Sequence, residues 1–316
     1  MTRVGDIYPV EKVVLREVGL RDGLQLTKTF PSTDTKREWI AKEYAAGVRH
    51  FEIGSFLPAT RFPQFADVRE MIETVTAHPG AHSAALTLNE RGLKDALQTD
   101  VDEIVCVVSA TEEHSQANAR RSRDDAVELV RMACAVREAA GHKAIINTGI
   151  SMAFGCSIAG SVEPAEVFRL VEKLLDAGAD IIGLADTVGF AGPQQVADLT
   201  GQTIALAGDQ PISVHLHDTR GLGLANASAA LDTGARILDA SLGGLGGCPF
   251  APGATGNIVF EDLVFLCETK GFATGIDLDA LAAAREIAEA SMPGEDFFGA
   301  IARAGPPPNT GWRASV

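Results

Sequence analysis

Eight short apolar runs, rich in Val and Ile, recur along the chain with helix-like segments between them. The runs begin at residues 13, 50, 82, 103, 143, 180, 212 and 236. Their mean spacing of about 32 residues matches the roughly 30 residues of a strand–helix–strand unit. Eight such units predict an α/β fold of the (β/α)8 TIM-barrel type, although a doubly wound open sheet would give a similar local pattern.

The length of 316 residues fits either one large barrel with appendages or two average domains. Beyond the last expected barrel helix, the chain continues with the alanine-rich amphipathic stretch LDALAAAREIAEASM and a Gly/Pro tail. No linker long enough to separate two domains precedes them. We therefore expect a catalytic barrel over residues 1–275, and an extra C-terminal helix with a tail over residues 276–316 of the same domain.

Charge and hydropathy exclude several classes of partner. The chain has 42 acidic and 27 basic residues, which gives a net charge of -15. A field of this sign repels polyanions, so nucleic acid and anionic membranes are not expected as partners. No stretch approaches the roughly 18 apolar residues of a membrane span, and the N-terminal segment lacks the apolar core of a secretion signal. A cytoplasmic protein is expected.

The five cysteines are scattered and odd in number, which argues against a disulfide framework or a structural zinc site. Cys106, Cys134 and Cys267 lie within expected strands or helices and fit inert core positions. Cys156 follows the fifth run, and its role is left open. Cys248 lies in the glycine-rich segment GGLGGCPFAPGATGN, residues 243–257, which suits a mobile flap beside a ligand. A reactive thiol is therefore expected at Cys248.

In a barrel of this kind, the active site forms at the carboxyl ends of the strands, so polar residues that close an apolar run are the candidates. These candidates are Glu17, Arg21, Asp22, Gln25, Glu52, Ser55, Asp186, Thr187, His215, His217 and Asp218.

The pair His215 and His217 lies two residues apart in one expected strand, so both imidazoles project from the same face. If that face is the barrel interior, the two side chains form a metal-ligand pair; a hydrogen-bonded core histidine is the alternative for either one. Asp22 and Asn257 can complete a set of nitrogen and oxygen ligands. This mixture favours Mg2+ or Mn2+ over a thiolate-bound zinc.

Arg21 places a cation beside Asp22 at the expected catalytic mouth, where it could polarise a carbonyl or stabilise an enolate oxygen. A structural ion pair with Glu17 or Glu52 is the alternative. A Schiff-base mechanism would need an inward lysine, but Lys143 begins the fifth run at the opposite end. The metal-assisted route is therefore favoured.

Five motifs, in this order, carry a family resemblance: VGLRDGLQ, FEIGSF, LADTVG, VHLHDTRGLGLAN and GLGGCPFAPGATGN. Over roughly residues 10–275 the chain resembles the 3-hydroxy-3-methylglutaryl-CoA lyases, which belong to the metal-dependent Claisen-type lyase and synthase barrels. The resemblance implies a carbon–carbon lyase of the oxo-acid-lyase class that releases acetyl-CoA and acetoacetate. Catabolism of leucine is the usual setting of the family, and related barrels often form homodimers.

The resemblance also implies roles for individual residues. Asp22, His215, His217 and Asn257 would hold the divalent cation, and Arg21 would contact the thioester carbonyl. Cys248, or a metal-site histidine such as His215, would transfer a proton. Glu52 and Asp186 would support the arginine and the base, and Gln25 and Lys28 would lie near the acyl-CoA. The phosphates of coenzyme A need local positive charge, for which Arg120, Arg121, Arg123, Lys28 and Arg61 are candidates, although a solvated helix start explains the first three equally well.

The sequence departs from the common lyase pattern at HDTR, ADT and FGCSIAGS, all around the expected substrate pocket. A related substrate such as citramalyl-CoA, cleaved to acetyl-CoA and pyruvate, is therefore an alternative. An acetyl-CoA-dependent 2-oxo acid synthase is a second one, but synthases usually show HND and lack the cysteine loop. A catalytically silent binding barrel is a third, and the intact ligand set opposes it.

Overall fold

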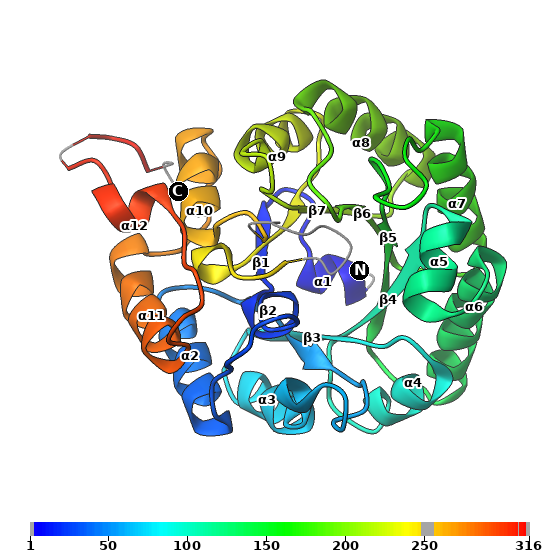
Figure 1. Ribbon diagram of the computed structural model, residues 1–316, viewed down its shortest axis with the longest axis horizontal. Helices are drawn as coiled ribbons and strands as arrows, with labels where there is room; N and C mark the ends of the chain where they lie inside the picture. Colours follow the sequence, from blue (N-terminus) through cyan, green and yellow to red (C-terminus); the bar gives the residue numbers. More distant parts are fainter. Residues whose placement is uncertain (1–2, 248–255, 309, 314–316) are drawn as a thin grey trace.

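The computed structural model describes residues 3–247, 256–308 and 310–313. Eight parallel strands close into a barrel in the order β1 to β8, as Figure 1 shows. This confirms the predicted TIM barrel and excludes the open sheet. The strands are β1 (Val14–Glu17), β2 (His50–Ser55), β3 (His82–Leu86), β4 (Glu103–Ser109), β5 (Ile145–Ser151), β6 (Ile181–Asp186), β7 (Ile212–Leu216) and β8 (Ile237–Ala240).

Helices surround the barrel, and side chains or prolines start several of them. The Ser32 side chain accepts a hydrogen bond from the amide of Thr35, which caps α2, and Pro164 occupies the first turn of α7. The surrounding helices are α2 (Thr33–Ala45), α3 (Val68–Thr76), α4 (Glu90–Ala96), α5 (Glu112–Ala119), α6 (Arg123–Ala139), α7 (Pro164–Asp176), α8 (Pro193–Ala207), α9 (Gly223–Asp232) and α10 (Phe260–Thr269).

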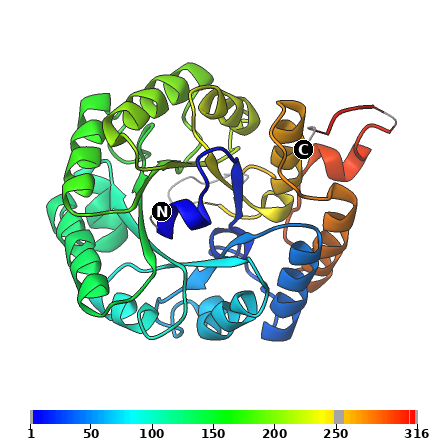
Figure 2. The same cartoon turned by 180° about the vertical axis from the view of Figure 1, so that it is seen from behind.

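A short N-terminal helix, α1 (Arg3–Ile7), lies across the barrel opening on the side seen in Figure 2. Ile7 and Tyr8 pack against residues that begin four of the strands, namely Val14, Ile145, Ile181 and Ile237. The sequence analysis did not predict this helix, because five residues are too few to show a helical period. It closes the amino-terminal end of the barrel and leaves the carboxyl ends of the strands for the site.

The C-terminal extension contains α11 (Leu278–Ser291) and α12 (Ala300–Ala304). Helix α11 packs against α2, and the amide of Asp277 donates to the carbonyl of Ala46 at 2.7 Å. The expected extra helix therefore exists and lies beside the barrel wall, while a boundary at residue 275 stays a prediction. Within the described ranges, every helix is too short or too polar to cross a membrane.

Two carboxyl groups are buried between the barrel and the helices around it. Glu17 accepts hydrogen bonds from the amides of Gly19 and Leu242, and burial raises its pKa to about 8. Glu43 on α2 is fully buried beside Trp39 of the same helix. Burial, followed by the negative charge of Glu17, holds the pKa of Glu43 well above its usual range.

We predict that Glu43→Gln stabilises the protein more at pH 8 than at pH 5. Because the folded pKa of Glu43 is raised, its contribution to stability is fully present below the unfolded pKa of about 4.3 and declines as the pH rises toward the folded pKa. Glutamine cannot ionise, so the variant escapes this decline. Thermal unfolding at both pH values measures the effect, with the exposed Glu38→Gln on the same helix as control. An equal shift in Tm at both pH values would contradict the prediction.

Candidate active site

The turn after β1 carries two of the predicted site residues, Arg21 and Asp22. Residues Gly19–Gly23 form one turn of π-helix, in which the amide of Gly23 donates to the carbonyl of Val18 at 3.1 Å. Such turns are rare and occur often at functional sites. The sequence placed both residues at a strand end, but the wider turn that aims them at the barrel mouth was not predicted.

Three of the four predicted metal ligands converge at the carboxyl end of β7. The Nε2 atoms of His215 and His217 lie 3.1 Å apart. The Oδ2 atom of Asp22 lies 3.5 Å from Nε2 of His217 and 3.9 Å from Nε2 of His215. All the ligand atoms of this cluster lie within 4.8 Å of one another. The two histidines therefore share the barrel interior, as their spacing predicted.

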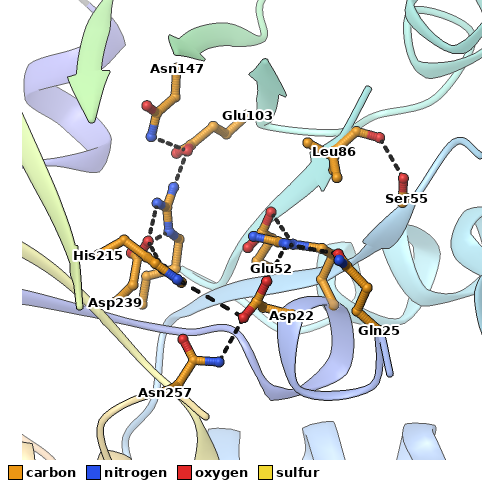
Figure 3. A network of polar contacts seen from close by, with 12 residues as sticks. Asp22, Gln25, Glu52, Ser55, Leu86, Glu103, Asn147, His215, Asp239 and Asn257 are labelled. Atoms are coloured by element: carbon orange, nitrogen blue, oxygen red, sulfur yellow. Dashed lines mark hydrogen bonds and ion pairs between the residues drawn. The ribbon is translucent and has the colours of Figure 1, made fainter. Parts of the chain in front are cut away.

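The fourth predicted ligand, Asn257, lies beside Asp22 (Figure 3). Its Nδ2 donates to Oδ2 of Asp22 at 2.8 Å and to the carbonyl of Leu245 at 3.0 Å. Its buried Oδ1 has no hydrogen-bond partner among the described residues, and an unpaired buried oxygen is costly. A carboxylate, two imidazoles and an unpaired amide oxygen form a donor set that fits a hard divalent cation.

A buried ion pair supports His215 from below (Figure 3). Oδ2 of Asp239 lies 3.2 Å from Nδ1 of His215, and Arg16 binds both oxygens of Asp239 at 2.8 and 2.9 Å. Arg16 also pairs with Glu103 on β4. A carboxylate on Nδ1 fixes the ring orientation and leaves Nε2 toward the other ligands. The sequence analysis missed Arg16 and Asp239, although both are charged residues inside apolar runs.

Arg21 is held by two carboxylates at the edge of this cluster. Its Nη1 lies 2.6 Å from Oδ1 of Asp22, and its Nε lies 2.7 Å from Oε1 of Glu52. The Oε1 of Gln25 accepts a longer hydrogen bond from Nη1, at 3.4 Å. Burial opposes ionisation of Asp22, but Arg21, then hydrogen bonding to His217 and the charge of His215, hold the pKa of Asp22 well below its usual range. A fixed cation therefore faces the mouth beside the candidate metal ligands.

Of two other predicted residues, Asp186 lies within electrostatic range of His215 and His217, whereas Lys28 stands apart from the cluster. The oxygens of Asp186 accept hydrogen bonds from the amides of Phe190 and Ala191, so this carboxylate holds the loop after β6. Burial raises the pKa of Asp186. Lys28 is exposed, and its backbone amide donates to Oε1 of Glu295 at 2.6 Å. In the part of the chain that the structure describes, neither Asp186 nor Lys28 contacts Arg21 directly.

Cys248, the expected reactive thiol, lies outside the described residues. Cys106, Cys134 and Cys267 are buried, and burial raises the pKa of their thiols to about 12, 11 and 12, respectively, which suits the inert core positions expected of them. The sulfur of Cys156, whose role was left open, accepts hydrogen bonds from the Thr111 hydroxyl and from two amides of its own turn, so it stabilises that turn.

Arg121 and Arg123, which follow β4, differ in their surroundings, which bear on whether either can bind a phosphate. Arg123 donates to the carbonyl of Ala110 and pairs with Glu166, so its guanidinium is engaged in the fold. Arg121 lines a hollow of about 780 Å³ between α4 and α6, together with Arg91. Glu90, Asp125 and Glu128 line the same hollow, so its carboxylates outnumber its guanidinium groups and the hollow does not favour an anion.

Comparison with known proteins places these observations in a family. The model of the HMGL-like family matches residues 12–288. The (R)-citramalyl-CoA lyase of Chloroflexus aurantiacus is 37% identical over 308 residues, which cover 94% of this chain and 96% of the relative. The 3-hydroxy-3-isohexenylglutaryl-CoA/hydroxymethylglutaryl-CoA lyase of Pseudomonas aeruginosa is 36% identical over 275 residues, which cover 86% of this chain and 90% of the relative.

Among solved structures, an Acinetobacter baumannii HMG-CoA lyase in complex with coenzyme A and 3-methylmalate superposes with a TM-score of 0.88. The two chains are 37% identical, and the match covers 96% of this chain and 98% of the other. The similarity therefore extends over the whole barrel, including every described element that carries a site residue.

We predict that the cluster of Asp22, His215 and His217 binds Mn2+, and that His217→Ala lowers the affinity at least about 100-fold, because it removes a direct ligand. Asp239→Asn should lower it by about 10-fold, the effect typical of a residue that orients a ligand. Isothermal titration of metal-stripped protein with Mn2+ measures both. His78→Ala, remote from the cluster after α3, is the control. Unchanged affinity in His217→Ala would refute the site.

Proposed function

This chain belongs to the HMGL-like family, and we propose that it is a carbon–carbon lyase that cleaves 3-hydroxy-3-methylglutaryl-CoA to acetyl-CoA and acetoacetate. The observation that carries the proposal is the convergence of Asp22, His215 and His217 beside Arg21. Ligands for a cation and a fixed guanidinium within one site suit a substrate that has both a hydroxy acid and a thioester.

In this proposal, Asp22, His215, His217 and Asn257 hold Mg2+ or Mn2+. When bound, the cation supplies Lewis acidity that lowers the pKa of the substrate's C3 hydroxyl. Asp239 keeps the Nε2 of His215 toward this site through its contact with Nδ1. Glu52 keeps the guanidinium of Arg21 at the mouth. The protein therefore presents prearranged groups to the oxygens of the substrate.

The reaction is a retro-Claisen cleavage. A nearby base takes the proton of the C3 hydroxyl, the C2–C3 bond breaks, and C3 becomes the ketone carbon of acetoacetate. The electron pair passes to the thioester enolate, whose negative charge Arg21 stabilises. A proton from the Cys248 thiol or from His215 then reaches C2 and completes acetyl-CoA. Asp186 supports the loop beside the base, while Gln25 and Lys28 lie on the acyl-CoA side.

Citramalyl-CoA is the second candidate substrate, and one observation favours it: the Chloroflexus aurantiacus relative named for that substrate is 37% identical to this chain. The same bond is cleaved in both substrates, but the carboxylate of citramalyl-CoA is attached directly to C3, and its second product is pyruvate. Two observations oppose the synthase and silent-barrel alternatives. Both relatives described above are named as lyases, and Asp22, His215 and His217 lie together as a possible metal site.

We further propose a role in leucine catabolism and a homodimeric state, which are the usual setting and a frequent state of the enzymes that the sequence resembles. We also propose the cytoplasmic location that was expected from the sequence.

The direct test incubates the purified protein with Mg2+ and, separately, with 3-hydroxy-3-methylglutaryl-CoA and citramalyl-CoA. Acetyl-CoA is measured together with acetoacetate or pyruvate, and a chelator-treated sample is the control. Acetoacetate release that the chelator abolishes is the expected result. Pyruvate from citramalyl-CoA alone would keep the mechanism and change the substrate, whereas cleavage of neither would overturn the proposal.

We predict that Arg21→Met lowers kcat by about 10²- to 10³-fold, because the developing enolate charge loses its cation. The affinity for Mn2+ should change by much less, since all four proposed ligands remain. Steady-state kinetics and titration with Mn2+ give the two values, with Arg37→Met on the exposed face of α2 as a matched control. If turnover and metal affinity fell by similar factors, the role of Arg21 would instead be to position the metal ligand Asp22.

A further inference from the structure

The interior face of β5 carries a glycine at the height of the site. Asn147, two residues earlier, donates from its Nδ2 to Oε1 of Glu103 inside the barrel at 2.8 Å. Because side chains alternate along a strand, Gly149 shares this interior face. Ile146 and Ile150, which alternate with Asn147 and Gly149 along the strand, belong to the outer core between barrel and helices. Gly149 therefore faces the lumen, on the side away from β1.

Gly149 belongs to a row of interior residues that solvent reaches. It pairs with Val107 on β4 and with Gly183 on β6, and Ala185, two residues beyond Gly183, pairs with His215 on β7. Gly149, Val107, Ala185 and His215 are all half-buried. The interior residues one step deeper are buried, namely Val105, Asn147, Gly183 and Ser213. The row is therefore the floor that a ligand entering from the mouth would meet.

Neither the backbone conformation nor close packing requires a glycine at position 149, so space for a side chain is left there. Its φ lies outside the left-handed region, so the backbone does not demand glycine. A Cβ built there meets one atom within 4 Å among the described residues, the carbonyl oxygen of Cys106 at 3.9 Å. At Gly183, by contrast, a Cβ would lie 2.9 Å from the Ser213 hydroxyl and 3.2 Å from Cα of Gly149. Gly183 is closely packed, and Gly149 is open.

The wall beside this space is apolar. Ala84, Leu86 and Val105 form a buried cluster on the interior of β3 and β4, and Leu88 and Val107 pack against it half-buried. The opposite side of the lumen carries Arg21 and the candidate metal ligands. The two sides therefore differ at the level of this row, while polar side chains of β4 and β5 lie deeper, at Glu103 and Asn147, and nearer the mouth, at Ser109 and Ser151.

A substrate bound as proposed above would use these two sides differently. Carbon C3 carries a hydroxyl, the C2 arm that leads to the thioester, the carboxylate arm and an alkyl group. The first three have polar partners on the side of Arg21, Asp22 and His215. The alkyl group has none, so it faces Val107, Gly149 and Ala185. Gly149 on β5 lies two strands from His215 on β7, a separation of about 10 Å along the sheet.

We propose that this row forms a subsite for the C3 alkyl group, and that the absence of a side chain at Gly149 lets the enzyme cleave 3-hydroxyacyl-CoA substrates with a C3 group larger than methyl. The inference rests on the proposed lyase function and specifies its substrate class. The Pseudomonas aeruginosa relative is named for both a 3-isohexenyl and a 3-methyl substrate, which differ in this same group.

The test compares 3-hydroxy-3-methylglutaryl-CoA with 3-hydroxy-3-butylglutaryl-CoA, by the acetyl-CoA that both release. For the wild-type enzyme, kcat/KM with the butyl substrate should equal or exceed that with the methyl substrate. Gly149→Val should lower kcat/KM for the butyl substrate at least about tenfold, mostly through KM, and change it for the methyl substrate less than threefold. Gly149→Ala, which adds one carbon, should have an intermediate effect.

Gly201→Val is the matched control, because a Cβ added to Gly201 on α8 also meets its nearest atoms at 3.9 Å, but on the outside of the barrel. It should leave the substrate ratio unchanged. Thermal unfolding identifies any Gly149 variant that loses its fold, and the wild-type comparison stands without the variants. Wild-type cleavage of the methyl substrate alone would overturn the subsite, as would equal losses for both substrates in Gly149→Val. If the wild-type enzyme cleaves neither of these substrates, the subsite is overturned, and citramalyl-CoA then decides the lyase proposal: failure to cleave it as well would overturn that proposal.

Discussion

The pairing of β1 with β8 is the contact on which the site depends. It joins Val14 to Ile237 and Glu17 to Ala240, so the first and last strands of the barrel become neighbours. The turn after β1 carries Arg21 and Asp22, and the segment after β8 returns with Asn257. Asp22 and Asn257 lie 235 residues apart in sequence, yet their side chains are hydrogen-bonded. Without barrel closure, neither the metal ligands nor the arginine would meet the histidines of β7.

Charge inside the barrel is tolerated because each group is paired. Arg16 is 3% exposed, and it binds Asp239 with two hydrogen bonds and Glu103 with a third contact. Removing one partner from such a buried pair leaves an uncompensated charge and is strongly destabilising. The same pairing places a carboxylate on Nδ1 of His215. The network that makes a polar interior possible therefore also orients a candidate ligand, as Figure 3 shows.

At the level of the site, the two sides of the barrel lumen differ in chemistry: one carries charged and imidazole groups, and the other carries apolar residues. Strands β1, β2, β7 and β8 supply the charged and imidazole groups that would bind oxygens and stabilise charge. Strands β3 to β6 supply Leu86, Val107, Gly149 and Ala185, which offer apolar contact and space but no proton or charge. Substitutions on the second side can change which alkyl group fits while the first side stays intact. If the proposed subsite holds the alkyl group, this division lets one barrel keep a reaction and vary its substrate.

The sequence by itself determined the barrel, because eight apolar runs at a regular spacing leave few other ways to bury their hydrophobic faces. It also indicated Asp22, His215, His217 and Asn257, since strand ends and a two-residue spacing can be recognised locally. Only the tertiary structure decided that Arg16 and Asp239 support His215, that Asp186 holds a loop, and that Gly149 is open while Gly183 is packed. These properties depend on which side chains from other strands lie opposite, and strand register across a closed barrel is a long-range contact that no local pattern encodes.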